Sequence, residues 1–267
     1  MIRSGSRFAR RLPWFKIAVG LGALAVVPAI LSAPAFGQLG GAIDHDALQI
    51  LKGMTDYLGG LERFAMHTDN SYEDVLDNGQ KLQFHFSSDV VVQRPNRLRV
   101  EQSEGEHRKI FIYDGETLSV HDGQQDFYAA VAAPDTIDDL LHFARDALDL
   151  VPPTGDMVFS NAFELLTAGI TSGFVVGKTV INGVTCDHLA FTTPVVDWQV
   201  WVADGDRPLP YKYVLTTRDD PAQPQFITLI TDWNVAPKIE DGLFEFEPPA
   251  TAMEIDFVRI DTGTSAP

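Results

Sequence analysis

The residues best suited to chemistry lie close together in one part of the sequence. Cys186, Asp187 and His188 are consecutive, and Asp197 follows shortly after them. A histidine beside a carboxylate can act as a general acid–base pair, so Asp187, His188 and Asp197 are the candidates for a hydrolytic site. The alternative is that an imidazole and a carboxylate fix strand register through a buried hydrogen bond. We favour this structural alternative, and we interpret Cys186 as a small buried apolar residue because the sequence fixes no base beside it.

Other catalytic and metal-binding patterns are missing from the sequence. The chain has no Gly-x-Ser-x-Gly elbow and no phosphate-binding loop. Its seven histidines include no pair at the helical spacing of a zinc protease, and its single cysteine cannot build a thiolate zinc site or an internal disulfide. We therefore expect a protein that is not an enzyme, with no catalytic residues, no metal and no cofactor.

The charge balance narrows the class of partner. The 267 residues include 37 acidic and 20 basic side chains, which gives a formal charge of −17. Such a chain repels the phosphates of nucleic acids and anionic lipid headgroups alike. Its 45% hydrophobic and 21% charged residues are those of an ordinary globular protein. We expect a folded protein with no nucleic-acid partner.

Residues 1–37 have the order of features of a secretory signal peptide. Basic residues precede an apolar stretch over 17–31, which is short for a membrane span, and small residues follow it. We expect cleavage, with Ala35-x-Gly37 ahead of Ala33-x-Ala35 as the site; an uncleaved anchor is the alternative. No cysteine follows for lipid attachment. The prediction is a periplasmic protein without stable membrane insertion, exported by the general secretory route rather than the twin-arginine route that Arg10-Arg11 weakly suggests.

Three helices are predicted from the spacing of apolar residues. The first covers 44–58, and the second covers 136–148, where Thr136 and Asp139 resemble a capping box. A third, shorter helix starts at Asn161, whose side chain we expect to cap it. The second and third helices form an insertion between two groups of strands.

The rest of the sequence alternates with a period of two, which indicates β-strands. Turn-forming residues separate the alternating runs and predict consecutive hairpins, in other words an antiparallel meander of about nine to eleven strands. These turns are Asp77-Asn78-Gly79, Pro95-Asn96, Asp114-Gly115, Asp122-Gly123 and Asn182-Gly183. A sheet of this length tends to curl, and its apolar concave side needs the helices as cover. We expect one domain over 38–267, mainly β (α+β).

Aromatic residues are numerous along the predicted strands. Trp198 and Trp201 lie an odd number of positions apart, so they should face opposite sides of the sheet. If the helices do not fill the concave side, an apolar cavity remains there. The predicted cavity residues are Phe64, Met66, Phe84, Phe86, Leu98, Val100, Phe111, Tyr113, Leu140, Leu141, Trp198, Val200, Phe226 and Trp233.

Several segments resemble an uncharacterised family of predicted bacterial periplasmic proteins within the lipoprotein-carrier superfamily, which includes the Lol-type carriers and their mycobacterial lipid-transport relatives. The matching segments are Arg94-Pro95-Asn96-Arg97-Leu98-Arg99-Val100, Tyr113-Asp114-Gly115-Glu116-Thr117-Leu118, Gly183-Val184-x-Cys186-Asp187-His188-Leu189-Ala190-Phe191, Val196-Asp197-Trp198-Gln199-Val200-Trp201-Val202, Gly205-Asp206-x-Pro208-Leu209-Pro210 and Tyr213-Val214-Leu215-Thr216. The resemblance covers about residues 44–257. It implies a curled antiparallel sheet that forms an open, incomplete barrel, with lid helices on the concave face and a hydrophobic cavity for acyl chains.

The resemblance also directs attention to two further segments. Residues 243–249, Leu-Phe-Glu-Phe-Glu-Pro-Pro, are similar to the family's ending, where a last stretch completes the sheet edge. A carrier that docks on partners is expected to show a basic rim, whereas here only Arg94, Arg97 and Arg99 form a local basic run. These arginines meet an acidic partner or protect a sheet edge from aggregation, and we favour the edge role.

The sequence therefore leaves three functional hypotheses. The first is a non-enzymatic carrier or chaperone that binds a lipid, a lipoprotein or another hydrophobic ligand between sheet and helices. The second is an envelope interaction module whose cavity is filled by its own helices and whose outer face or strand edge binds a protein. The third is a hydrolase that uses Asp187, His188 and Asp197.

Overall fold

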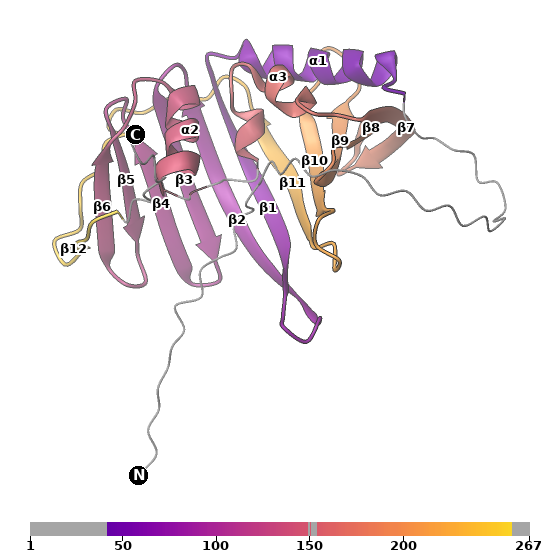
Figure 1. Ribbon diagram of the computed structural model, residues 1–267. Helices are drawn as coiled ribbons and strands as arrows, with labels where there is room; N and C mark the ends of the chain where they lie inside the picture. Colours follow the sequence, from indigo (N-terminus) through magenta and orange to yellow (C-terminus); the bar gives the residue numbers. More distant parts are fainter. Residues whose placement is uncertain (1–41, 149, 151–153, 258–267) are drawn as a thin grey trace, which may run out of the picture.

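The computed structural model describes residues 42–148, 150 and 154–257, so the predicted signal peptide over 1–37 lies outside the described residues. Figure 1 shows one long curled sheet with helices on one side of it. The elements are, in chain order, α1 (His45–Gly59), β1 (Arg63–Val75), β2 (Lys81–Gln93), β3 (Arg97–Glu104), β4 (His107–Tyr113), β5 (Thr117–Asp122), β6 (Phe127–Ala132), α2 (Ile137–Leu148), the 3-10 helix η1 (Gly155–Met157), α3 (Ala162–Thr167), β7 (Ser172–Ile181), β8 (Val184–Thr192), β9 (Val196–Ala203), β10 (Pro210–Thr217), β11 (Gln225–Asn234) and β12 (Met253–Glu254).

All strands of the described residues belong to one 12-stranded sheet in the order β12-β6-β5-β4-β3-β2-β1-β11-β10-β9-β8-β7. Two antiparallel meanders, β1 to β6 and β7 to β11, join where β1 pairs with β11. The sheet does not close, because β7 and β12 remain its two edges. The predicted mainly β fold with a curled, open antiparallel sheet is therefore confirmed.

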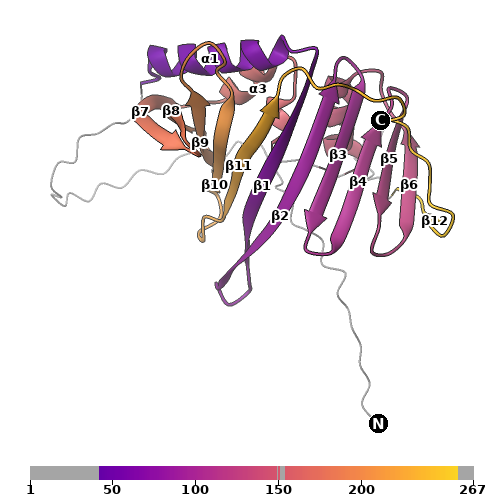
Figure 2. The same cartoon turned by 180° about the vertical axis from the view of Figure 1, so that it is seen from behind.

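The helices lie on the concave side of the sheet. In Figure 1 α2 stands in front of the strands, α1 runs along the ends of β7 to β11, and α3 lies beneath α1; seen from behind in Figure 2, the sheet covers α2. Leu51 and Met54 of α1 and Leu140 of α2 belong to the same buried core as the strand residues. The helices therefore cover the concave face as predicted.

Two helix starts follow the prediction and one does not. Asp44 caps α1 by accepting from the backbone N–H of Asp46 at 3.0 Å, and the Thr136 hydroxyl of the capping box accepts from Asp139 N–H at 3.1 Å. The side chain of Asn161 makes no capping hydrogen bond to α3, so that expectation was wrong. The preceding residue, Ser160, is held by α2 instead: its N–H donates to an Asp138 carboxylate oxygen at 3.0 Å.

The sheet contains 12 strands rather than the expected nine to eleven. The strand that a sequence pattern could not show is β12, since its two residues, Met253 and Glu254, are too few for an alternation. They pair in parallel with β6, next to Phe127 and Tyr128. The segment that completes this sheet edge is therefore 253–254.

Residues 243–249 do not complete the edge, which corrects the expectation from the family resemblance. They form no β-strand, and they cross the convex face towards β12, as Figure 2 shows. The Arg99 guanidinium donates to the Leu243 carbonyl at 3.1 Å, and the Phe246 ring lies 5.7 Å from Tyr128 and 6.3 Å from His121. This stretch is a strap on the outside of the sheet.

The arginine run does not lie at an edge either. Strand β3 pairs with β2 on one side and β4 on the other, so Arg97 and Arg99 sit in the sheet interior and the favoured edge role was wrong. Their guanidinium groups bind carbonyl oxygens, Arg97 that of Asp114 and Arg99 that of Leu243. Arg94, in the loop before β3, donates to the Val158 carbonyl.

Candidate functional site

The strand pairings define which side chains share the concave face, because alternate residues of a strand point to the same side. On β1 these are Phe64, Met66, Thr68, Asn70 and Tyr72, and their partners on β2 and β11 continue the same face. Phe64 is 1% exposed and belongs to the main core that includes the helices. The concave face is therefore the sheet side on which a ligand would meet both sheet and helices.

All 14 predicted cavity residues lie on this face or on the helix surface packed against it, but to different depths. Nine are buried in this structure: Phe64, Met66, Leu98, Tyr113, Leu140, Leu141, Trp198, Val200 and Phe226. Five are half-buried: Phe84, Phe86, Val100, Phe111 and Trp233. The protein's own helices thus fill a large part of the concave side, while five of these side chains, at separate positions on the face, stay half-buried.

Trp233 reaches the concave side through an irregularity in β11. The register between β1 and β11 shifts between Ala65 and His67, and Asp232 has a positive φ of 52°. The extra residue reverses the alternation, so that Trp233 packs on Phe64 with ring centroids 5.9 Å apart. Its indole N–H donates to the Pro210 carbonyl at 2.9 Å.

One row of the concave face is almost entirely aromatic. Direct cross-strand pairs connect six strands in the order Phe84, Tyr72, Phe226, Leu215, Trp198 and Phe191, which we call the aromatic row. Phe84 stacks on Tyr72 at 5.4 Å, and Trp198 stacks on Phe191 at 4.3 Å. Phe84 and Tyr72 at one end of the row are half-buried, as is Leu215 within it, whereas Phe226, Trp198 and Phe191 are 4%, 3% and 2% exposed.

The deep end of the row depends on a glycine. Gly173 of β7 pairs with Phe191, and a Cβ at Gly173 would lie 2.3 Å from the Phe191 ring. Only glycine lets this ring lie flat against the neighbouring strand. One end of the aromatic row, Phe84, lies on the β1–β2 hairpin, which extends beyond the other strands in Figure 1. The other end, Phe191, is packed against β7 near α1.

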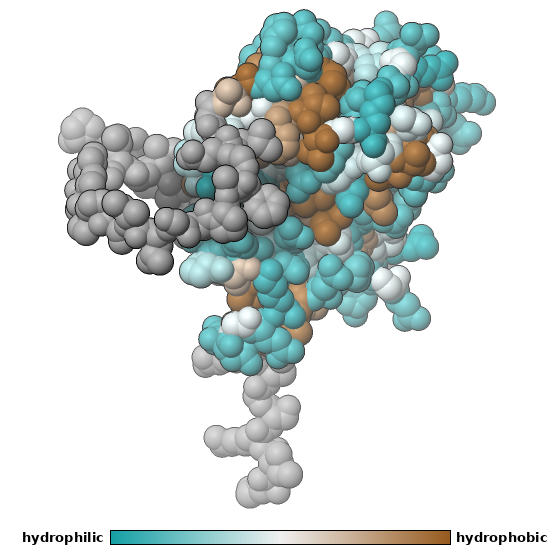
Figure 3. All heavy atoms as spheres, turned by 90° about the vertical axis from the view of Figure 1, so that its right-hand side faces the viewer, coloured by the Kyte–Doolittle hydropathy of each residue, from teal (hydrophilic) through white to brown (hydrophobic). Residues whose placement is uncertain are grey.

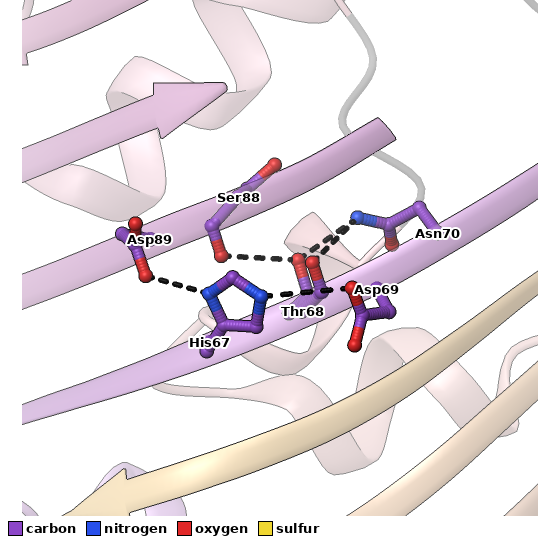
Figure 4. A network of polar contacts seen from close by, with 6 residues as sticks. All are labelled: His67, Thr68, Asp69, Asn70, Ser88 and Asp89. Atoms are coloured by element: carbon purple, nitrogen blue, oxygen red, sulfur yellow. Dashed lines mark hydrogen bonds and ion pairs between the residues drawn. The ribbon is translucent and has the colours of Figure 1, made fainter. Parts of the chain in front are cut away.

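A second feature of the concave face is a band of polar side chains beside the aromatic row. It comprises Gln102, Ser88, Thr68, Asn70, Thr228 and Tyr213, on the five neighbouring strands β3, β2, β1, β11 and β10, and we call it the polar band. Asn70 donates to the Thr68 hydroxyl at 2.9 Å, and that hydroxyl donates to the Ser88 carbonyl at 3.4 Å (Figure 4). Thr68 and Asn70 are 2% and 5% exposed. Apart from the half-buried Gln102 the band is buried, and its side chains are uncharged.

Sequence reasoning missed Tyr72 and the polar band. The alternation of β1 was recognised only at Phe64 and Met66, because the polar residues Thr68 and Asn70 interrupt its apolar pattern. The predicted turn over 77–79 carried the missing signal. A hairpin centred there requires β1 to continue to Val75, and the period of two then places Tyr72 opposite Phe84.

Of the residues that had suggested acid–base chemistry, His188 and Asp197 lie on the convex face, whereas Asp187, which pairs with Val202, points to the other side of the sheet. The His188 ring lies on the Trp201 ring with centroids 4.0 Å apart, and the Lys212 Nζ atom lies 4.7 Å from the centroid of the Trp201 ring. Trp201 belongs to a separate small cluster with the fully buried Cys186, so Trp198 and Trp201 face opposite sides as predicted. Burial lowers the pKa of His188, the Gln199 hydrogen bond raises it and the Lys212 charge lowers it.

No carboxylate of the candidate hydrolytic set is bonded to His188 among the described residues. The His188 Nε2 atom is hydrogen-bonded to Gln199 at 2.9 Å. Asp187 faces Lys178 at 3.4 Å and Asp197 faces Arg218 at 3.6 Å. The register-fixing hydrogen bond is therefore present, but its acceptor is an amide rather than the expected carboxylate, and the three residues do not form one site.

A second histidine on the convex face does contact carboxylates. His67 Nδ1 lies 2.7 Å from Asp89 and its Nε2 lies 3.6 Å from Asp69 (Figure 4). The hydrogen bond to Asp89 raises the pKa of His67, burial lowers it, and the charges of Asp89 and Asp69 raise it. This exposed cluster is an ion pair on the sheet surface.

The described residues show neither a membrane helix nor a metal cluster. No helix among them is long and apolar enough to cross a membrane. Within the same residues, no group of three or more histidine, cysteine, aspartate or glutamate side chains is placed to hold a metal ion.

Comparison with solved structures gives distant matches. Lipoprotein LppX of Mycobacterium tuberculosis is 16% identical, with a TM-score of 0.48 over 74% of this chain and 100% of that chain. LprF from Mycobacterium bovis is 15% identical, with a TM-score of 0.46 over 79% and 100%. A LolA superfamily protein from Nitrosomonas europaea is 11% identical, with a TM-score of 0.34 over 75% and 97%.

Comparison with protein families gives a match over most of the sequence. None of the curated proteins matches this chain. Residues 47–258 match the family described as "Predicted periplasmic protein (DUF2092)", which accounts for well over half of the sequence. The chain therefore belongs to the DUF2092 family of predicted periplasmic proteins.

Proposed function

We propose that this protein is a non-enzymatic periplasmic carrier that holds an apolar ligand, a lipid or an acyl chain, between the concave face and the helices. The observation that carries the proposal is the contrast in exposure between the two ends of the aromatic row. Phe84 and Tyr72 present half-buried rings on the concave side, and the same apolar row continues across Phe226 and Leu215 to the buried Trp198 and Phe191. A chain that enters at the exposed rings finds apolar surface along its whole length.

The energetics of such a site are favourable. Removal of apolar surface from water contributes about 25 cal/mol per Å², so covering the exposed half of two aromatic rings and a long acyl chain yields several kcal/mol. Aromatic surface also adapts to chains of different saturation, because it offers contact without a fixed hydrogen-bond pattern. The helices already occupy the deep part of the concave side, so ligand entry requires them to shift.

The first experiment identifies what the protein carries. The full chain is expressed in its own periplasm and purified without detergent, and bound molecules are extracted and analysed by mass spectrometry. We expect lipid or another apolar molecule at close to one molecule per chain. Protein that carries no apolar molecule, and that also takes up none when incubated with fatty acid or phospholipid vesicles, contradicts the proposal.

A variant pair then tests the location. Phe84→Ser removes a ring at the exposed end of the aromatic row, and we expect about tenfold weaker retention of the ligand, since a buried aromatic side chain contributes about 1.5–3 kcal/mol. The control is Leu229→Ser, which removes a half-buried apolar side chain of β11 from the convex face. Equal loss in both variants would place the ligand elsewhere.

The interaction-module alternative has one observation in its favour. Strand β7 is an edge of the sheet, and Val176 and Val180 on it are 50% and 62% exposed. Figure 3, which looks at this end of the molecule, shows hydrophobic residues gathered among hydrophilic ones. However, the β7 edge also carries an irregularity at Gly177 and the charged Lys178, which are features that prevent a strand edge from pairing. A ligand-free protein that recovers one defined envelope protein would support this alternative.

A further inference from the structure

The polar band runs through a face that is otherwise apolar. Asn70 pairs with Thr228, and Thr228 pairs with Tyr213, so these three side chains form the row next to the aromatic row, about 7 Å away along the strands. On the other side of the band lie Met66 and Val90, which belong to the main core. An apolar ligand on the aromatic row would therefore lie alongside a line of hydrogen-bonding groups.

One member of the band has no partner. The Thr228 hydroxyl is fully buried, on a residue that is 0% exposed, and it has no hydrogen-bond partner among the described residues. A buried hydroxyl without a partner costs about 1–3 kcal/mol, which a valine of the same shape would avoid. The register places this hydroxyl on the concave face between Asn70 and Tyr213.

Few charged side chains of the described residues act on this part of the band, and burial disfavours the charged form of the one nearest to Tyr213, Asp156. Asp156 of η1 lies near enough that its charge, in addition to burial, raises the pKa of Tyr213. Burial also raises the pKa of Asp156 itself, while Arg145 and His142 lower it. At the opposite, exposed end the face continues into the ion pair of Lys109 and Asp122, 3.6 Å apart. The buried part of the band thus suits an uncharged group, and its exposed end suits a charged one.

We propose that the ligand carries an uncharged hydrogen-bonding group, an ester carbonyl or a hydroxyl, within its apolar chain, and that Thr228 binds this group beside Asn70. Hydrocarbon then extends along the aromatic row on both sides, towards Phe84 at the exposed end and towards Trp198 at the buried end. The unpartnered hydroxyl is a donor held ready for a ligand acceptor. This inference rests on the proposed function, because it names the class of apolar molecule that the same face holds.

The test is a competition between two probes of matched chain length. Delipidated full chain is incubated with equal amounts of decyl octanoate, an ester flanked by hydrocarbon on both sides, and a saturated hydrocarbon. The protein is separated by gel filtration, and the retained probes are measured by gas chromatography. We expect the wild type to retain the ester in excess by about threefold to tenfold, the range that a single net hydrogen bond supports. The ratio does not depend on how much protein is folded.

Three variants assign the preference to the hydroxyl. Thr228→Val should bring the ratio close to one, and Thr228→Ser, which keeps a hydroxyl, should preserve it. The matched control is Thr217→Val, because Thr217 also has a buried hydroxyl without a partner among the described residues but lies two rows away on β10. Thr217→Val should keep the wild-type ratio of retained ester to retained hydrocarbon.

The possible results separate the two proposals. If neither probe is retained by any form, the proposed function fails. If both probes are retained equally by the wild type, or if Thr228→Val keeps the preference for the ester, the apolar site stands and the inference about the polar group is overturned. Loss of the preference in Thr228→Val, with retention in Thr228→Ser and Thr217→Val, supports it.

Discussion

The Arg94 guanidinium donates to the carbonyl oxygen of Val158 at 2.7 Å. Arg94 lies in the loop between β2 and β3, at the rim of the sheet, and Val158 lies in the segment between η1 and α3. The neighbouring Pro95 carbonyl accepts from Ile137 N–H, the first residue of α2, at 2.8 Å. The helical insertion is thus fastened to one short loop of the sheet, and a movement of the insertion that admits a ligand must pivot near this loop or break its bonds.

Replacing Arg94 tests this fastening. Arg94→Gln removes the charged donor, and we expect the free energy of unfolding to fall by about 1.5–3 kcal/mol, as for other hydrogen bonds from charged groups. Amide hydrogen exchange should accelerate in residues 155–167 while β1 and β2 keep their protection. The control is Arg108→Gln at an exposed position of β4. Uniform acceleration over the whole chain would show that Arg94 stabilises the fold generally rather than the insertion.

Two glycines of α1 should respond to alanine in opposite directions. A Cβ at Gly59 would lie 2.9 Å from the Ser160 carbonyl oxygen, whereas a Cβ at Gly53 meets nothing within 4 Å. Gly59→Ala must therefore push α1 away from the backbone before α3, and we expect a loss of about 1–3 kcal/mol in the free energy of unfolding. Gly53→Ala should gain about 0.5–1 kcal/mol from helix propensity alone.

Urea denaturation of both glycine variants provides the measurement. A similar change in both would mean that α1 and the Ser160 segment are not in close contact in solution. The comparison is sharp because both substitutions add the same methyl group to the same helix, so they differ only in what that methyl group meets.

Two histidines of the convex face, His67 and His188, should have pKa values shifted in opposite directions from the ordinary value. The Asp89 hydrogen bond raises the pKa of His67 above 6.5, so its contribution to stability is present below about pH 6.5 and is lost as the pH rises through the folded-state pKa. Burial lowers the pKa of His188, so its contribution is present above about pH 6.5 and is lost as the pH falls through the folded-state pKa. NMR titration of the ring protons measures both pKa values in one experiment.

One variant assigns the shift of the His67 pKa to its cause. Asp89→Asn should return the pKa of His67 towards 6.5 and leave His188 unchanged, because the two rings lie on different strands of the face. The pair is exposed on the Asp89 side, so its effect on the free energy of unfolding should stay below about 1 kcal/mol. A pKa of His67 at or below 6.5 in the wild type would contradict the contact.

Local sequence signals foresaw much of this structure. The helix spacing gave α1, the same kind of spacing with the capping box at Thr136 gave α2, and the Asn182-Gly183 pair gave a hairpin whose two turn residues both have positive φ. These signals are short-range, since a cap or a turn is decided by residues within a few positions. Trp198 and Trp201 on opposite faces followed equally from the period of two.

Long-range pairing could not be foreseen in the same way. That His188 meets Gln199 rather than a carboxylate depends on the register of β8 against β9, and that Arg99 meets Leu243 depends on a strap 144 residues further along the chain. The reversal at Trp233 depends on a single extra residue in β11. Among the site residues, the apolar ones were recognisable by type, whereas Thr228 gains its significance only because its hydroxyl finds no hydrogen-bond partner within the part of the chain that the structure describes.

The strap over residues 243–249 leads to the last prediction. Phe246 lies against the rings of Tyr128 and His121 on the convex face, and the strap then continues to β12 at the edge of the sheet. Phe246→Ala removes the aromatic contacts, which contribute about 0.5–1.5 kcal/mol beyond the buried area. We expect the strap to detach locally, so limited proteolysis should cut between 247 and 252 faster than in the wild type while β1 to β5 remain intact. Ile255→Ala serves as control, since Ile255 is 47% exposed and its side chain should matter little to the cleavage rate. Equal cleavage rates for the wild type and Phe246→Ala would show that the Arg99 bond to Leu243 holds the strap without the ring.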